Sequence, residues 1–423
     1  MRLFIRTTSV LVALAAAAPA QAATVSPAGV RFPQLAVNAD GASVVAWERL
    51  TKHAIAIEAR AGDAPLELGR RRRLSADGHQ PQVAVGADGT KAVMWLEEDA
   101  SRRRSVRVAV ARPGHGFGRG QLVARRRGNV SVVGVAIQPT GRVVAVWQRT
   151  AGRLAFALAL RGHAFGRSHD VAAITQPAAG SIPVDPRDGS VVIAYDTPPT
   201  PSPPANQQAA VRTLPMSATT LSAPTILSQG PGTSPFTEAY PSLASGPAGV
   251  AVAFVQVGDP YSLKLVRRDA DGSWAAPERI AAPSAGPDVF PSGLRATLAT
   301  GGSAVAAWSL DTQGVGLAGT ISTQIVASIA GSSSAFGPPQ PLTAAGGHFG
   351  VPAVAAAGDE AFVATAEPHG RVLLATRAPG AGAFAAPVAL TDHGDGDVLL
   401  STGGAHVLAA YQQGDRLHVE IVR

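Results

Sequence analysis

Acidic and amide side chains recur at one position of the sequence, at or just after the end of a short apolar run that carries a large aromatic residue. They are Glu48, Glu97, Gln148 and Asp196 in the first half of the chain, and Gln256, Glu367 and Gln412 in the second. A pair of carboxylates is what a glycosidase needs on either side of the bond that it cleaves. The same residue types also prefer the surface, where a strand leaves the core and meets water. Their recurrence therefore predicts a shared polar surface, for a ligand or for solvent.

A second set of polar residues lies in the segments between these runs. It contains Asp77, His79, Glu238, Asp288, His348, Asp392 and His393. The acidic stretch 392–397, DHGDGD, offers carboxylate oxygens to calcium, but it lacks the EF-hand spacing and the glutamate at the twelfth position. We therefore expect no metal site and no cofactor.

Motifs of common enzyme classes are missing from the sequence. It contains no HExxH, no P-loop and no G-x-S-x-G. A binding role is thus favoured over catalysis, and we expect no catalytic residues.

The elements that position these residues are read from a repeat. A glycine precedes the aromatic residue by six positions in several units, as in Gly41 and Trp47 or Gly302 and Trp308. Eight units are found, with the aromatic residue, or Thr365 in its place, at positions 47, 95, 147, 195, 254, 308, 365 and 411. Units of about 40–50 residues that repeat to the end of a chain are typical of propellers and solenoids.

Each unit reads as four strands. Proline often opens the first strand, as in FPQLAV; a glycine turn precedes the second, as in SVVAW; an alternating third strand such as HAIAIEAR follows; a second turn leads to the fourth. The second strand is apolar on both sides, so both of its faces must be buried. This pattern predicts an all-β chain that forms a single β-propeller of eight four-stranded blades, with seven blades as the alternative.

The last unit predicts how the ring closes. Its third strand, RLHVEIVR, ends the sequence, so the fourth strand must come from elsewhere. Residues 23–31 precede the first unit and can supply it. We expect one domain, 23–423, with a proline-rich loop at 196–208 inserted in the fourth unit; a linker between two four-unit domains is the alternative.

The first 22 residues have the features of a secretory signal peptide: Arg2 and Arg6, a short apolar run, and a small-x-small site at Ala20–Ala22. Cysteine is absent from the chain, so no disulfide and no lipid on a cysteine are available. No segment has the roughly 20 apolar residues that a membrane span needs. We expect a secreted or periplasmic monomer without a membrane anchor.

Charge is unevenly distributed along the chain. Residues 23–212 hold 25 basic and 14 acidic residues, whereas residues 213–423 hold 9 and 15. Arginine runs at 70–73, 102–104 and 125–127 supply much of the excess. Such a field can attract a polyanion, although arginines on outer strands can also serve solvation alone.

The repeat resembles exported bacterial β-propeller proteins in general. RRDADGSWAAPERI, residues 267–280, resembles a degenerate Asp-box, the turn between the outer strands of sialidase-like propellers; it is a structural turn there and implies no sialidase activity. In propellers, ligands bind around the axis on the face that carries the loops after the second and fourth strands. The resemblance implies that the polar residues named above lie on that face.

Three functions fit these observations. We favour a non-enzymatic binding protein for an envelope or extracellular polymer, polyanionic or glycan, or for a protein partner. A structural or assembly protein without a small-molecule site comes second, and a polysaccharide hydrolase or lyase third. Nothing in the sequence indicates specific recognition of nucleic acid.

Overall fold

The fold is known from a computed structural model of the chain. The residues that it describes are 22–99, 101, 103–127, 130–149, 152–175, 177–178, 182–198, 207–228, 241–256, 262–281, 289–313, 321–345, 347–367 and 370–423. Within them, every regular element is a β-strand, and the strands form eight antiparallel sheets. No helix of the described residues could cross a bilayer.

The first four sheets are blades 1 to 4, in chain order. Blade 1 comprises β2 (Val30–Val37), β3 (Ser43–Leu50), β4 (Ile55–Gly62) and β5 (Arg72–Ser75). Blade 2 comprises β6 (His79–Val85), β7 (Lys91–Glu98), β8 (Arg103–Ala111) and β9 (Gln121–Arg127). Blade 3 comprises β10 (Ser131–Ile137), β11 (Val143–Arg149), β12 (Arg153–Ala159) and β13 (His169–Ala173). Blade 4 comprises β14 (Val191–Asp196), β15 (Ala209–Leu214) and β16 (Thr225–Ile226).

The other four sheets are blades 5 to 8. Blade 5 comprises β17 (Ser242–Gly246), β18 (Gly249–Gln256), β19 (Ser262–Arg267) and β20 (Glu278–Ala281). Blade 6 comprises β21 (Val289–Leu298), β22 (Ala304–Gln313), β23 (Ile321–Ala330) and β24 (Gln340–Pro341). Blade 7 comprises β25 (Ala353–Ala357), β26 (Glu360–Ala366), β27 (Val372–Arg377) and β28 (Val388–Thr391). Blade 8 comprises β29 (Gly394–Gly403), β30 (His406–Gln413), β31 (Arg416–Ile421) and β1 (Ala23–Thr24).

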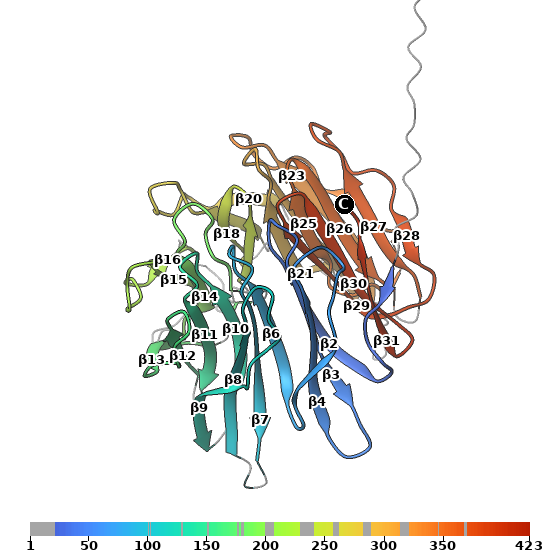
Figure 1. Cartoon of the computed structure of the whole chain (residues 1–423). Coiled ribbons are helices and arrows are strands. Elements are labelled where there is room, and N and C mark those ends of the chain that lie inside the picture. The colour runs from blue at the N-terminus through green and yellow to red at the C-terminus, as the bar shows by residue number, and fades with distance from the viewer. Residues whose placement is uncertain are drawn as a thin grey trace, which may run out of the picture.

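The blades form a closed ring, and the prediction of an eight-bladed propeller is confirmed (Figure 1). Eight clusters of buried apolar residues each join two neighbouring blades, and together they pass through every blade. The first strand of each blade is innermost, because neighbouring blades contact each other through strands such as β2, β6 and β10. One blade alone could not bury both of its faces, which is why the second strands are apolar on both sides.

The repeated aromatic residues are wedges between blades. The side chains at positions 47, 95, 147, 195, 254, 308 and 411 are all buried, and Thr365 is buried in the same place in blade 7. Trp47 packs in the cluster between blades 8 and 1, and Trp95 in the cluster between blades 1 and 2. These residues therefore serve the core.

The ring closes as the sequence predicted. β1 pairs with β31, with Ala23 opposite Val419 and Thr24 opposite His418. The backbone of Val25 continues the ladder by donating to the carbonyl of Leu417 at 2.9 Å. Residues from both tails thus share blade 8.

Blade 4 departs from the regular pattern. It has three strands, and isolated bridges from Pro177 to Tyr195 and from Val184 to Val191 occupy its inner edge. Part of the predicted proline-rich loop, 199–206, lies outside the described residues. In blade 5 the Asp-box-like turn is formed: Gly272 has a φ of 88°, and Asp271 accepts hydrogen bonds from the backbone and hydroxyl of Ser273.

Candidate functional site

The mouth is defined here as the face that carries the loops after the second and fourth strands of each blade. Three of the predicted site residues meet there at the junction of blades 1 and 2. Asp77 comes from the loop between β5 and β6, His79 is the first residue of β6, and Glu97 lies at the end of β7. The His79 ring lies 4.0 Å from the Asp77 carboxylate.

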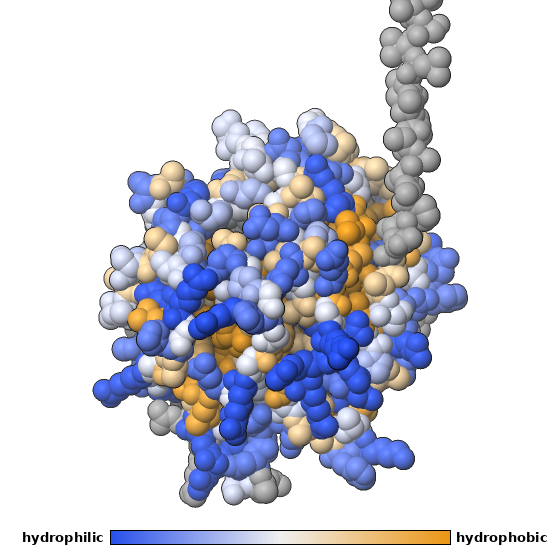
Figure 2. All heavy atoms as spheres, in the orientation of Figure 1, coloured by the Kyte–Doolittle hydropathy of each residue, from blue (hydrophilic) through white to orange (hydrophobic). Residues whose placement is uncertain are grey.

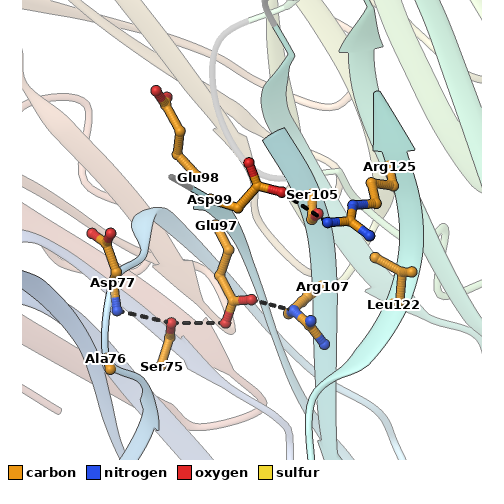
Figure 3. A pocket seen from close by; sticks show the side chains of 10 residues that line it. All are labelled: Ser75, Ala76, Asp77, Glu97, Glu98, Asp99, Ser105, Arg107, Leu122 and Arg125. Carbon is orange, nitrogen blue, oxygen red and sulfur yellow. Dashed lines mark hydrogen bonds and ion pairs between the residues drawn. The ribbon is translucent and has the colours of Figure 1, made fainter. Parts of the chain in front are cut away.

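A pocket of about 330 Å³ lies at this junction (Figure 3). It is lined by Ser75, Ala76, Asp77, Glu97, Glu98, Asp99, Ser105, Arg107, Leu122 and Arg125. Blade 1 supplies one wall from the β5–β6 loop, and blade 2 supplies the other from β7, β8 and β9. The volume is at the lower end of the range for small-molecule sites.

Glu97 is fixed at the centre of the pocket by three donors. Its Oε1 accepts a hydrogen bond from the Ser75 hydroxyl at 2.8 Å, and its Oε2 pairs with Arg107 (Figure 3). The Trp95 indole also donates to Oε1, at 3.2 Å. Trp95 is a wedge of the core, so the position of Glu97 is coupled to the packing between blades 1 and 2. A carboxylate held in this way is a rigid negative charge.

The other blade 2 carboxylates are also paired with arginine. Asp99 lies 2.7 Å from Arg125, and Glu98 lies 2.9 Å from Arg104. The hydrogen bond from Arg125, together with backbone donors, holds the pKa of Asp99 below its usual value. Asp99 therefore stays ionised at neutral pH and does not suit the role of a general acid.

Other groups in the pocket have hydrogen-bonding capacity to spare. Ser105 is only 8% exposed, yet its hydroxyl has no hydrogen-bond partner within the described part of the chain. Asp77 is exposed, and Leu122 presents an exposed apolar side chain beside Arg125. The pocket can therefore accept a polar ligand that also has an apolar face.

Arg107 and Arg125 line this pocket, and further arginines lie on or next to the strands that form it. We call the set the arginine wall: Arg70 to Arg73 of blade 1, and Arg103, Arg104, Arg107 and Arg125 of blade 2. Residues 70–73 are exposed. In blade 2 the backbone register sets Arg103 opposite Arg127 and Arg104 opposite Arg126. In Figure 2 strongly hydrophilic residues lie over the region that Figure 1 labels β4, β7 and β8, with apolar residues between them.

Two predicted residues at the ends of second strands are buried. Glu48 is almost fully buried, and its Oε1 accepts a 2.7 Å hydrogen bond from the backbone of Gln80 in blade 2. Asp196 is buried at the end of β14. Gln148 is half-buried, and its amide oxygen accepts a hydrogen bond from Ser131.

The remaining predicted residues do not join the pocket. His348 is exposed before blade 7, and Asp392 and His393 are exposed between blades 7 and 8. Glu238 and Asp288 lie outside the described residues. Among the described residues, including the whole acidic stretch 392–397, no group of three or more His, Asp or Glu side chains could hold a metal ion.

Most of the pocket residues were missed by sequence reasoning. Ser75, Ser105, Arg107 and Arg125 come from outer strands, whose pairing register cannot be read from apolar alternation. The arginine runs were a usable signal, because two of them lie in neighbouring strands. Nothing in the sequence linked those runs to Glu97.

Comparison with known proteins supports the fold. No protein-family model matches the chain, and no curated protein matches it. The polysaccharide lyase Uly1 is similar in structure, with 10% identity, a TM-score of 0.56, and coverage of 82% of this chain and 90% of the lyase. The β-propeller domain of the Trilobed protease from Pyrococcus furiosus has 8% identity, a TM-score of 0.46, and coverage of 87% and 99%. At 10% identity the likeness to Uly1 shows the propeller fold alone.

Proposed function

We propose that this protein is a binding propeller that holds an acidic polymer on the arginine wall, beside the pocket between blades 1 and 2. The observation that carries the proposal is the exposed arginine run 70–73 of blade 1, in which Arg70 and Arg72 have no partner among the described residues. A polyanion that binds these arginines would release its own counter-ions.

The exposed arginines of blade 1 extend the same surface. Arg71 shares the buried carboxylate of Glu58 with Arg49, at 3.3 and 3.1 Å. Arg70 and Arg72 are exposed and have no partner among the described residues. Their charges are therefore available to a ligand.

The pocket chemistry supports binding rather than cleavage. Glu97 and Asp99 are both paired with arginine, whereas a glycosidase needs one carboxyl group that stays protonated. Hydrolase or lyase activity is a separate outcome of the test below: it would release new reducing ends or an unsaturated sugar from the polymer. An assembly protein without a polymer site would not bind the polymer.

The test is chromatography on immobilised heparin at several salt concentrations. We expect the purified protein to be retained at low salt and released as salt rises, and Arg70→Glu/Arg72→Glu to elute earlier. Two lost contacts would lower the slope of log affinity against log salt by about 2.

The matched control is Arg153→Glu/Arg167→Glu, which reverses two exposed charges on blade 3. It changes net charge equally but leaves the arginine wall intact, so we expect nearly unchanged retention. Equal shifts for the two double variants, or no retention of the unaltered protein at low salt, would overturn the proposal.

A further inference from the structure

The blade 2 side of the pocket is a row of three side chains on three neighbouring strands. The backbone register sets Glu97 of β7 opposite Ser105 of β8, and Ser105 opposite Arg125 of β9. Side chains directly opposite each other in an antiparallel pair lie on the same face, with Cβ atoms roughly 5 Å apart. The row faces blade 1, because Ser75 of blade 1 donates to Glu97 at 2.8 Å. All three side chains of the row therefore meet in one cavity.

Blade 2 differs from its neighbours in this row. The second residue after the aromatic wedge is Arg49 in blade 1 and Arg149 in blade 3, whereas it is Glu97 in blade 2. The third-strand residue opposite the wedge is Glu58 in blade 1 and Arg107 in blade 2. The ion pair between these two positions is therefore reversed in blade 2, which puts the carboxylate nearer the mouth. This acidic side of the pocket distinguishes blade 2 from the blades on either side.

One carboxylate of the pocket lacks a basic partner. Arginine pairs with three of the four carboxylates that line the pocket: Glu97 with Arg107, Glu98 with Arg104, and Asp99 with Arg125. The fourth is Asp77 of blade 1, which has no arginine or lysine partner among the described residues. The His79 ring lies 4.0 Å from the Asp77 carboxylate, which is beyond hydrogen-bond distance. Asp77 thus gives the pocket a negative charge that no arginine or lysine compensates.

The blade 2 side of the pocket has hydrogen-bond donors to spare. Ser105 is 8% exposed and lines the cavity, and its hydroxyl has no partner in the described part of the chain. Arg125 donates to Asp99 through one nitrogen, at 2.7 Å, and its side chain is 53% exposed, so its other N–H groups remain available. Figure 3 shows Asp77 and Arg125 on opposite sides of the cavity, with Glu97 and Ser105 between them. The pocket therefore offers a free anion on the blade 1 side and a cation on the blade 2 side.

This polarity restricts which polymer can pass from the arginine wall into the pocket. An acidic group beside Asp77 would be repelled, because like charges brought together oppose binding. An ammonium group at the same place would form an ion pair with Asp77. An acidic group that follows the ammonium group along the polymer would then meet Arg125. A polymer with only negative groups fits the arginine wall but not the pocket.

We propose that the bound polymer is zwitterionic, with free amino groups beside its acidic groups, and that one of its ammonium groups binds in the pocket. The ammonium group pairs with Asp77, and a neighbouring hydroxyl bonds to Ser105. The carbon skeleton packs on Leu122, whose apolar side chain is 49% exposed. This inference rests on the proposed function, and it narrows the ligand from acidic polymers in general to acidic polymers of unsubstituted amino sugars.

The test is titration calorimetry at one low salt concentration with two forms of one polymer. N-desulfated heparin carries free ammonium groups, and the same material after N-acetylation carries neutral acetamides; both keep their O-sulfates. The arginine wall alone would favour the N-acetylated form, because that form has the larger net negative charge. We expect the reverse order, with the ammonium form bound about threefold more tightly by the unaltered protein.

The decisive variant is Asp77→Asn, which should weaken binding of the ammonium form and leave binding of the N-acetylated form nearly unchanged. The matched control is Asp392→Asn, which removes an exposed carboxylate between blades 7 and 8 and should keep the preference. Equal affinity for the two forms, tighter binding of the N-acetylated form, or a preference that survives Asp77→Asn would refute the zwitterionic ligand and leave the arginine wall in place. If neither form binds, the proposed function fails as well.

Discussion

At the scale of single residues, the buried carboxyl group of Glu420 makes the stability of the ring sensitive to pH. Glu420 lies on β31, next to the closure strand, and is only 3% exposed. Burial raises its pKa to about 7 and raises that of Tyr411 to about 12. The rings of Tyr411 and His418 stack at 5.9 Å in the same place. One proton therefore decides whether a charge is buried beside the seam.

The stability of the protein should depend on that proton. The carboxyl group of Glu420 titrates near 4.5 when unfolded and near 7 when folded. Its contribution to the free energy of unfolding is complete below pH 4.5 and is lost as pH rises to about 7, on the order of 3 kcal/mol. We expect Glu420→Gln to remove this decline in urea unfolding measured from pH 4.5 to 7.5.

His418 also contributes to the pH dependence of the free energy of unfolding, so the variant must be compared with the unaltered protein. Burial lowers the pKa of His418, so its contribution is lost as pH falls through its range, in the opposite sense. The difference between the two proteins cancels this part. A difference that does not vary with pH would contradict the assignment to Glu420.

At the scale of elements, blades are fastened to each other by polar contacts at the face opposite the mouth. Between blades 4 and 5, Asp185 is fully buried and lies 2.7 Å from both Arg187 and Arg268. Arg268 also reaches Asp188 at 2.8 Å. These ion pairs hold the turn of blade 4 that contains Asp185 and Asp188 against the end of β19 in blade 5, where Arg268 lies.

Removing Asp185 from this cluster should lower the free energy of unfolding. Asp185→Ala leaves the buried Arg268 with Asp188 alone and takes the carboxylate partner from Arg187, and we expect a loss of about 3 kcal/mol in chemical denaturation. Asp185→Ala/Arg268→Met should recover part of that loss, because the more buried of the two arginine charges is gone. Losses that simply add in the double variant would show that the two side chains are not coupled.

The elements themselves were predictable because their signals are local. A glycine turn followed by a two-sided apolar strand predicts the first hairpin of each blade, and the unit around Thr365 was correctly counted although it lacks the aromatic wedge. Blade 4 was the exception, since its inner edge is made of isolated bridges rather than a regular strand. Length and turn chemistry do not report such a break.

The candidate site was predictable only in part, for a physical reason. Asp77 and Glu97 were named from their position in the unit, and both line the pocket. The partner Ser75 depends on how blade 1 packs against blade 2, and the partner Arg107 depends on the register between β7 and β8. Neither is encoded in a single repeat.

At the scale of the whole molecule, the ring depends on a short closure strand. β1 has two residues, and its pairing with β31 is extended by Val25 and by the Ser26 hydroxyl, which accepts from the backbone of Leu417 at 2.8 Å. These contacts join residues more than 390 positions apart. Every other blade is built from one continuous stretch of chain.

A disulfide across this seam should stabilise the ring. Thr24 and His418 face each other in the register, with 3.4 Å between their side chains, and the chain has no other cysteine. We expect Thr24→Cys/His418→Cys to be more stable when oxidised than when reduced, by on the order of 6 kcal/mol in the chain-entropy model. Each single variant should show no redox dependence; an oxidised protein no more stable than the reduced one would mean that the seam does not limit unfolding.

Binding of an acidic polymer to the arginine wall can be observed by hydrogen exchange with mass spectrometry, in the presence and absence of heparin. We expect slower exchange in peptides covering 70–75 and 103–107, with blades 5 to 7 unchanged. Protection confined to blades 5 to 7, or none at saturating heparin, would contradict it.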